Sequence, residues 1–168
     1  MPVAPSRKPT RAREFDYRDP GPYFVTICTQ HRVHRFGQIT EGIMHLTDAG
    51  VMACNTWKMV PQSFPGTVLD EFVVMPNHIH ALLTLRVPAD HSLDGMVSLT
   101  GIVGWFKTQT TRRYIGGVKR DDWPRFDGQL WQRSFHDEIV RTERGMERLR
   151  LYIEGNPANW IEDELYDV

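Results

Sequence analysis

The sequence predicts an α+β fold, a ferredoxin-like or RRM-like antiparallel β-sheet with helices packed on one of its faces. Three observations carry this prediction. Strand-like and helix-like segments follow one another in the order β, α, β, β, α, β, α. Proline and glycine stand between these segments, where a sheet has to turn. The length of 168 residues suits one domain with its own core, and we expect residues 22–168 to form it after a flexible basic arm over residues 1–21.

The first strand and the first helix come early in the chain. "PYFVTICTQ" (22–30) is rich in β-branched and aromatic residues, as strands are, and the turn-rich "HRFGQITEG" after it has room for a short second strand. Thr47 is a suitable N-cap for a helix whose apolar residues recur at helical spacing. Pro61 and the Pro65–Gly66 pair end that helix.

The middle of the chain predicts two strands and a second helix. "TVLDEFVVMPN" and "HIHALLTLR" are strand-like, and they meet in a tight hairpin or corner at Pro76–Asn77 because proline is poorly tolerated inside a central strand. The second helix starts near Met96 or Ser98 and ends at Gly116–Gly117.

The last part of the chain predicts one strand and one helix. "LWQRSFHDEIV" alternates apolar and polar residues well enough to be a strand. Thr142 is a candidate N-cap for a closing helix that extends to Pro157.

Composition and charge exclude several classes of protein. No apolar run approaches the ~20 residues of a membrane helix, and the basic, proline-rich start lacks the apolar core of a secretory signal. We therefore expect a soluble, cytoplasmic protein. Cys28 and Cys54 lack the spacing of a zinc site and are expected to be reduced packing residues. The net charge of −1 indicates no polyanion partner by itself, but the window from Gly101 to Arg120 is basic and contains no acid.

Two histidines, His78 and His80, interrupt the apolar run "EFVVMPNHIHALLTL". Alternate side chains of a strand point to the same face, with their Cα atoms roughly 6 to 7 Å apart, so both imidazoles could bind one metal ion. A neutral imidazole (ordinary pKa ~6.5) offers a lone pair at physiological pH. Because His-x-His is a short and common pattern, one structural and one exposed histidine is the alternative interpretation.

The closing helix supplies two further candidates in "YIEGNP". Tyr152 and Asn156 are four residues apart, which places them on one helix face roughly 5 to 6 Å from each other. An amide oxygen suits Mg²⁺ or Mn²⁺, and two imidazoles with one oxygen leave positions open for a phosphate. A neutral tyrosine is a weak nucleophile, because forming its phenolate at pH 7 costs roughly 4 kcal/mol. A Lewis-acidic metal could offset this cost. A helix tyrosine packed on the sheet is the commoner use of such a residue.

Three segments in this order resemble a known family: "MPNHIHALLTL", "IVGWFKTQTTRRYI" and "LWQRSFHDEIVRTERGMERLRLYIEGNPANW". They are similar to the single-tyrosine transposases that act on single-stranded DNA, the HUH endonucleases of insertion sequences. "WQRSFHDEIVR" and "YIxxNP" look more like the REP-associated tyrosine transposases than the minimal enzymes. The resemblance spans roughly residues 22 to 160, and it implies a ferredoxin-like sheet with a C-terminal helix that carries the nucleophilic tyrosine.

The resemblance also implies roles for individual residues. His78 and His80 correspond to the histidine pair that binds a catalytic divalent metal, Mg²⁺ or Mn²⁺, and Tyr152 corresponds to the nucleophile that forms a 5′-phosphotyrosine link. Asn156 stands where the minimal enzymes have a glutamine, so it is the candidate third ligand, directly or through a water. His136 and its neighbour Asp137 lie in a recurring family segment, and a structural role is favoured for them.

Basic residues are the candidates for DNA contacts. Lys107, Arg112 and Arg113 lie on one predicted helix and could contact phosphates, which orient a nucleic acid without reading its sequence. The basic arm could order on a hairpin through four residues: Arg7, Lys8, Arg11 and Arg13. Ordinary solvated charge is the alternative for both groups. Three aromatic residues could stack on unpaired bases, although core packing is favoured for them: Trp105, Trp131 and Phe135.

These features together predict a metal-dependent endonuclease and strand transferase that cleaves single-stranded DNA beside an imperfect, REP-like hairpin. Two rival functions remain open. A non-catalytic nucleic-acid-binding domain would keep the basic helix without needing Tyr152, and a metal-dependent phosphoesterase would use the histidines without a covalent intermediate. The chain could act as a monomer or a homodimer. The REP-associated relatives look like monomers, so the monomer is favoured.

Overall fold

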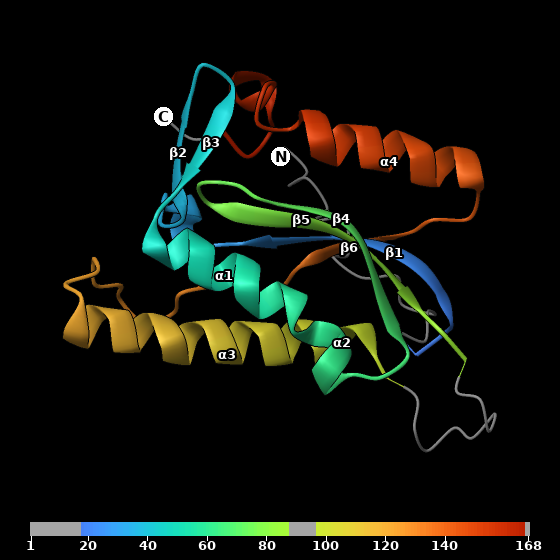
Figure 1. Ribbon diagram of the computed structural model, residues 1–168, viewed down its shortest axis with the longest axis horizontal. Helices are drawn as coiled ribbons and strands as arrows, with labels where there is room; N and C mark the ends of the chain where they lie inside the picture. Colours follow the sequence, from blue (N-terminus) through green and yellow to red (C-terminus); the bar gives the residue numbers. More distant parts are fainter. Residues whose placement is uncertain (1–17, 88–96, 167–168) are drawn as a thin grey trace, which may run out of the picture.

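A computed structural model describes residues 18–87 and 97–166. Its centre is a four-stranded antiparallel sheet in the order β4-β5-β1-β6 (Figure 1). The four strands are β1 (Gly21–Cys28), β4 (Thr67–Val74), β5 (His78–Leu85) and β6 (His136–Ile139). The predicted antiparallel α+β fold is confirmed, and β4 and β5 form the hairpin expected at Pro76–Asn77.

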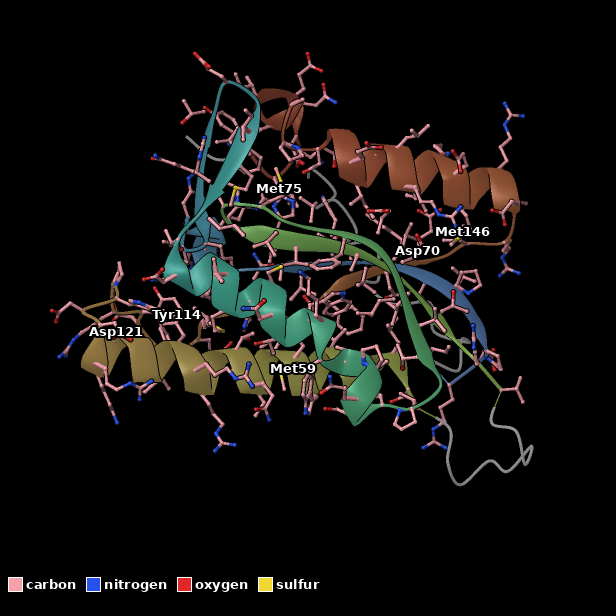
Figure 2. All side chains as sticks on the ribbon, viewed as in Figure 1. Met59, Asp70, Met75, Tyr114, Asp121 and Met146 are labelled. Carbon is pink, nitrogen blue, oxygen red and sulfur yellow. The ribbon has the colours of Figure 1, made fainter. Side chains whose placement is uncertain are left out.

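The two central strands are buried on both faces of the sheet. Helices α1 (Asp48–Lys58) and α3 (Leu99–Arg120) pack on one face, and α4 (Glu143–Gly155) packs on the other (Figure 1). The side chains of β5 point alternately to the two faces of the sheet. Ile79 and Leu83 belong to the core under α1 and α3, whereas Leu82 belongs to the core under α4. Figure 2 shows Met146 of α4 and Asp70 of β4 between α4 and the sheet.

The expectation that all helices lie on one face is therefore wrong for α4. The reason is visible in β5, where seven of the eight residues are buried. A strand buried on both faces needs a cover on each side, and α4 provides the second cover with three buried residues: Met146, Leu149 and Ile153.

The helix starts agree with the sequence predictions. The hydroxyl oxygens of Thr47, Ser98 and Thr142 each accept a hydrogen bond from the backbone N–H three residues later, at 3.0 to 3.2 Å. The second long helix differs at its end, since α3 continues through Gly117 to Arg120. A Cβ on Gly117 would lie 2.2 Å from the Trp123 ring, so this glycine permits close packing instead of ending the helix.

Several short elements complete the chain. The turn-rich stretch with a predicted short strand contains β2 (Gly37–Thr40), which forms a hairpin with β3 (Ile43–Leu46) directly after that stretch. A short helix, α2 (Val60–Ser63), follows α1, and two 3-10 turns, η1 (Gln30–Arg32) and η3 (Trp160–Glu162), follow β1 and α4. The predicted last strand is shorter than expected. Only His136–Ile139 is a strand, and Trp131 forms an isolated bridge with Thr29.

The aromatic residues considered for base stacking lie in the core. Trp131 and Phe135 are buried, and Trp105 is partly buried against the same cluster, which confirms the packing interpretation. Cys28 and Cys54 are free thiols, as expected. Within residues 18–87 and 97–166, no helix combines the length and the apolar character needed to cross a membrane.

Candidate active site

The two histidines of β5 point to the α4 side of the sheet and lie side by side. His78 is opposite Cys28 and His80 is opposite Thr26 in the antiparallel register with β1. Their ring centroids are 4.4 Å apart, and both residues are almost completely buried. The predicted shared face is therefore confirmed.

In both histidines, Nδ1 has a hydrogen-bond partner that orients the ring. Asn77 donates its Nδ2–H groups to the carbonyl oxygens of Arg32 (3.2 Å) and Leu165 (2.9 Å), which leaves its Oδ1 to accept from His78 Nδ1–H at 2.7 Å. His80 Nδ1 lies 2.8 Å from the Thr26 hydroxyl oxygen. Nδ1 of His78 therefore carries the proton, and its Nε2 keeps a lone pair.

A carboxylate stands opposite the two imidazoles. Asp163, just after η3, places Oδ2 4.0 Å from Nε2 of His78 and 4.0 Å from Nε2 of His80. One ligand atom from each of the three residues lies within 4.8 Å of the others. The other carboxylate oxygen accepts the backbone N–H of Leu165 at 2.7 Å, which fixes the orientation of the group.

Asn156, the predicted third ligand, lies next to this group. Its side chain is buried at the end of α4, and Nδ2–H donates to Asp163 Oδ2 at 3.0 Å. Its Oδ1 is buried without a hydrogen-bond partner among the described residues. The structure therefore brings Asn156 into contact with the carboxylate of the three-residue group, although Asp163 is the residue that faces both histidines.

Tyr152 completes the site from α4. Its hydroxyl group lies 3.3 Å from His80 Nε2, and its ring is edge-on to Phe24, which itself stacks on His80 at 5.3 Å. The residue is 45% exposed, so the phenol can be reached from solvent while its oxygen lies beside the imidazoles. Figure 1 shows that α4 runs across this face of the sheet.

The environment keeps both imidazoles neutral and the phenol protonated. Burial, and then the neighbouring His80 and Arg32, lower the pKa of His78 well below its ordinary value. Burial lowers the pKa of His80 to about 4, although Asp163 opposes this shift. For Tyr152, burial and the charge of Asp163 raise the pKa above its ordinary value. Near neutral pH the two rings are therefore available as ligands, while the phenol needs activation before it can attack.

The donor set fits a divalent cation. His78 Nε2 is buried and has no hydrogen-bond partner among the described residues, which is costly unless something occupies it. Two neutral imidazoles and one carboxylate carry a single negative charge, and this mixture of nitrogen and oxygen donors suits metals such as Mn²⁺, Mg²⁺ or Zn²⁺.

A pocket of about 580 Å³ opens beside Tyr152, His80 and Asp163. Its walls combine the apolar Phe24 and Leu149 with polar and charged groups. The arginine and imidazole side chains among them are Arg32, His80, His136 and Arg148, and the acids are Asp163 and Glu164. His136, for which the sequence favoured a structural role, is exposed on β6 opposite Thr26 and lines this pocket. The pocket can accommodate an anionic group next to the phenol.

The predicted DNA-contacting residues of α3 lie on the other face of the sheet (Figure 1). The Lys107 ammonium donates to three backbone carbonyl oxygens, at Gln132, Arg133 and Ser134. Arg113 donates to the Thr56 hydroxyl at 2.9 Å, while Arg112 is exposed. The structure does not bring these residues to Tyr152. The four predicted residues of the N-terminal arm lie outside the described residues: Arg7, Lys8, Arg11 and Arg13.

Sequence reasoning missed the roles of Asp163, Asn77 and Arg148. Asp163 belongs to the acidic end "WIEDELYDV", and only the turn of η3 brings it back to the histidines. Asn77 had a usable signal, because a metal-ligating histidine usually donates its second ring N–H to a nearby oxygen, and Asn77 is adjacent to the candidate pair. Arg148 also had one, because it stands four residues before Tyr152.

The fold is that of a REP-associated tyrosine transposase. The solved structure of such an enzyme, bound to a REP hairpin, is similar to 89% of this chain and 72% of its own, with a TM-score of 0.59 and 20% sequence identity. A candidate transposase from Deinococcus radiodurans matches 86% of this chain and 95% of its own, with a TM-score of 0.47 and 20% identity. The first of these two structures confirms, at the level of the fold, the resemblance that the motifs indicated.

Sequence comparison places the chain in a family. An uncharacterized protein of Haemophilus influenzae (strain Rd) is 32% identical over 169 residues, which cover 95% of this chain and 93% of the relative. The chain belongs to the same family as this Haemophilus protein. No protein-family model matches the chain.

Proposed function

We propose that the chain is a metal-dependent, single-strand DNA endonuclease and strand transferase of the HUH type, acting beside hairpin DNA. The observation that carries the proposal is the distance of 3.3 Å between the Tyr152 hydroxyl and His80 Nε2, in a group that also holds His78 and Asp163. The DNA hairpin bound to the structural neighbour supports the substrate class.

His78, His80 and Asp163 would hold the metal, with Asn156 orienting the carboxylate or serving as a further oxygen donor. A divalent cation bound there would act as a Lewis acid on the phosphate, favour departure of the 3′ oxygen and offset the charge of Asp163. Thr26 and Asn77 keep the two imidazoles in place.

Tyr152 would carry out the transfer. Its hydroxyl oxygen attacks the phosphorus and loses its proton, the bond from phosphorus to the 3′ oxygen breaks, and that oxygen leaves as a hydroxyl after taking a proton. The product is a 5′-phosphotyrosine link, which the 3′-hydroxyl of another strand can attack in the reverse reaction. The exposure of Tyr152 supports access for a nucleic-acid backbone, whereas its raised pKa means that the phenol of the free protein is poorly activated.

We also propose that the site works in cis, as a monomer. The phenol and both imidazoles come from one chain, so no second copy is needed to complete the catalytic group. This differs from an arrangement in which two chains exchange their tyrosines.

The direct test incubates the protein with Mn²⁺ or Mg²⁺ and a labelled single-stranded oligonucleotide that contains an imperfect hairpin. We expect a protease-sensitive adduct on a denaturing gel that disappears in Tyr152→Phe. This variant is a clean control because Tyr152 is 45% exposed and phenylalanine keeps its ring while removing only the hydroxyl group. Binding without cleavage would support a nucleic-acid-binding domain, and cleavage that persists in Tyr152→Phe would support a phosphoesterase; either result would contradict the proposal.

A further inference from the structure

Helix α4 separates its charged residues into stripes. Its buried stripe faces the sheet. A second stripe, at spacings of three and four residues, contains the acids together with Arg150: Glu143, Glu147, Arg150 and Glu154. The Arg150 guanidinium is neutralised there by Asp70 at 2.8 Å, Glu143 at 3.2 Å and Glu147 at 3.6 Å.

A third stripe, hereafter the arginine stripe, consists of Arg144, Arg148 and Tyr152. Each member follows the previous one by four residues, so the stripe climbs the helix in steps of about 6 Å and spans about 12 Å. At about 3.4 Å per stacked nucleotide, this length covers three or four nucleotides of one strand. The stripe ends at the proposed nucleophile.

The arginine stripe is continuous with the pocket. Arg148 and Tyr152 line the pocket together, and His136 lines it from β6. Arg148 lies over β6, since its guanidinium is 3.8 Å from the Glu138 carboxylate. Both partners of this pair are largely exposed, at 72% and 54%, and such pairs are weak and easily exchanged for another anion.

Charged groups line both sides of the pocket. Asp163 stands over the histidines of β5, and Arg32 donates to the backbone carbonyl of the next residue, Glu164, at 3.4 Å. Arg148 and His136 stand over β6, two strands away and thus roughly 10 Å across the sheet, where Glu138 is the carboxylate paired with Arg148. A phosphate that reaches Arg148 can replace Glu138, because this exposed ion pair is weak.

We propose that the arginine stripe is the track for the single strand next to the reacting phosphate. Arg148 contacts a phosphate about two nucleotides from the reacting one and Arg144 contacts a phosphate further along the strand, so both are positioning residues for Tyr152. This inference rests on the proposed function and replaces α3 as the main DNA-contacting surface, because α3 lies on the opposite face and Lys107 is bound to three carbonyl oxygens.

The first test measures binding of the hairpin oligonucleotide to Arg144→Ala, Arg148→Ala and the double variant, in the Tyr152→Phe background without metal. We expect each single variant to lose several-fold in affinity at low salt. The slope of log K against log[salt] should fall by about 0.7 for each lost phosphate contact on a single strand. Arg86→Ala, which removes an exposed arginine at the end of β5, controls for total charge, and Arg112→Ala tests the rival surface on α3.

The second test locates the contact. Neutral methylphosphonates are placed one at a time through the unpaired flank of the oligonucleotide. We expect one position to weaken binding to the Tyr152→Phe protein but to cause no further loss once Arg148→Ala is present. Arg148→Lys should restore part of the affinity, because a lysine keeps the charge without the planar fork.

The two possible failures are distinguishable. If an adduct forms on Tyr152 while the α4 variants bind DNA as well as Arg86→Ala, or Arg112→Ala alone loses binding, the arginine stripe is excluded and the proposed function stands. A second failure has a different signature. If no adduct forms with any probe, but one methylphosphonate position weakens binding and causes no further loss in Arg148→Ala, the arginine stripe stands and the proposed function fails.

Discussion

At the scale of single residues, the site depends on Asn77. This amide is 1% exposed and joins three parts of the chain: the first 3-10 turn through the Arg32 carbonyl, the C-terminal segment through the Leu165 carbonyl, and His78 through its ring nitrogen. It therefore fixes both the tautomer of His78, a candidate metal ligand, and the segment that brings Asp163 to the site.

We predict that Asn77→Ala destabilises the protein by about 2–4 kcal/mol, because a buried donor and two buried acceptors lose their partner. Affinity for Mn²⁺ should fall about 10- to 100-fold. Asn77→Asp keeps an oxygen against His78 and should retain more of the metal affinity while it still loses stability. Urea unfolding and calorimetric titration measure the two effects, and equal loss of metal affinity in both variants would contradict an orienting role.

The residues of the site differ in how far the sequence could predict them. His78 and His80 follow from strand alternation, and Tyr152 and Asn156 follow from helical spacing, so local geometry and the family resemblance were enough to find them. Asp163 depends on a reversal of the chain after α4, which η3 and the packing of Trp160 against His78 produce. Contacts of that kind are tertiary and leave no periodic pattern in the sequence.

At the scale of elements, a small apolar core holds α4 on the sheet. Its buried side chains, Met146, Leu149 and Ile153, form a small core with Leu82 and Val140. Because Tyr152 is carried by this helix, the position of the nucleophile depends on that core. A second attachment is the contact of Arg150 with Asp70 on β4.

We predict that Ile153→Ala costs about 2–4 kcal/mol, since it leaves a cavity in the α4 core. Adduct formation should fall more than hairpin binding, because the phenol moves while the arginines remain exposed. Leu151→Ala is the matched control, since Leu151 is 60% exposed on the same helix. Thermal unfolding and single-turnover cleavage test this, and equal effects of the two variants would argue against the α4 core as the support of the site.

The attachment through Asp70 predicts a dependence on pH. Hydrogen bonds from Arg150 lower the pKa of Asp70 below its ordinary value of 3.8. A carboxyl whose pKa is lowered in the folded state stabilises the fold above its unfolded pKa, and this contribution disappears as the pH falls through the folded pKa. The stability difference between the natural protein and Asp70→Asn should therefore be larger at about pH 5 than at about pH 3, as measured by urea unfolding. A difference that does not change with pH would contradict the ion pair.

At the scale of the whole molecule, the sheet separates the large hydrophobic core from the candidate site. The face under α1 and α3 holds the large core, and the face under α4 holds the site (Figure 1). Figure 2 shows Met59 and Tyr114 in the layer of α1 and α3, away from Asp70 and Met146. The antiparallel α+β class was predictable from the sequence, but the face taken by α4 was not, because β5 is apolar on both sides apart from the histidines and Thr84.

His78 and His80 lie on β5 and Asp163 lies after α4. A cation bound by all three residues would join these segments and should stabilise the whole fold. At Mn²⁺ concentrations about 100-fold above the dissociation constant, the gain is about 2.7 kcal/mol, or roughly 5–10 °C in Tm for a domain of this size. The shift should be lost in His78→Ala, His80→Ala and Asp163→Asn but kept in Glu154→Gln, an exposed acid of α4. An unchanged shift in the first three variants would exclude this group as the metal site.

The residue to which the DNA becomes attached tests the proposed function most directly. The adduct formed with Mn²⁺ and a hairpin oligonucleotide is digested with protease and nuclease, and the modified peptide is sequenced by mass spectrometry. We predict a 5′-linked nucleotide on the phenol oxygen of Tyr152. A nucleotide found on another residue, such as Tyr166, or cleaved DNA with no peptide attached to it, would contradict the proposed function.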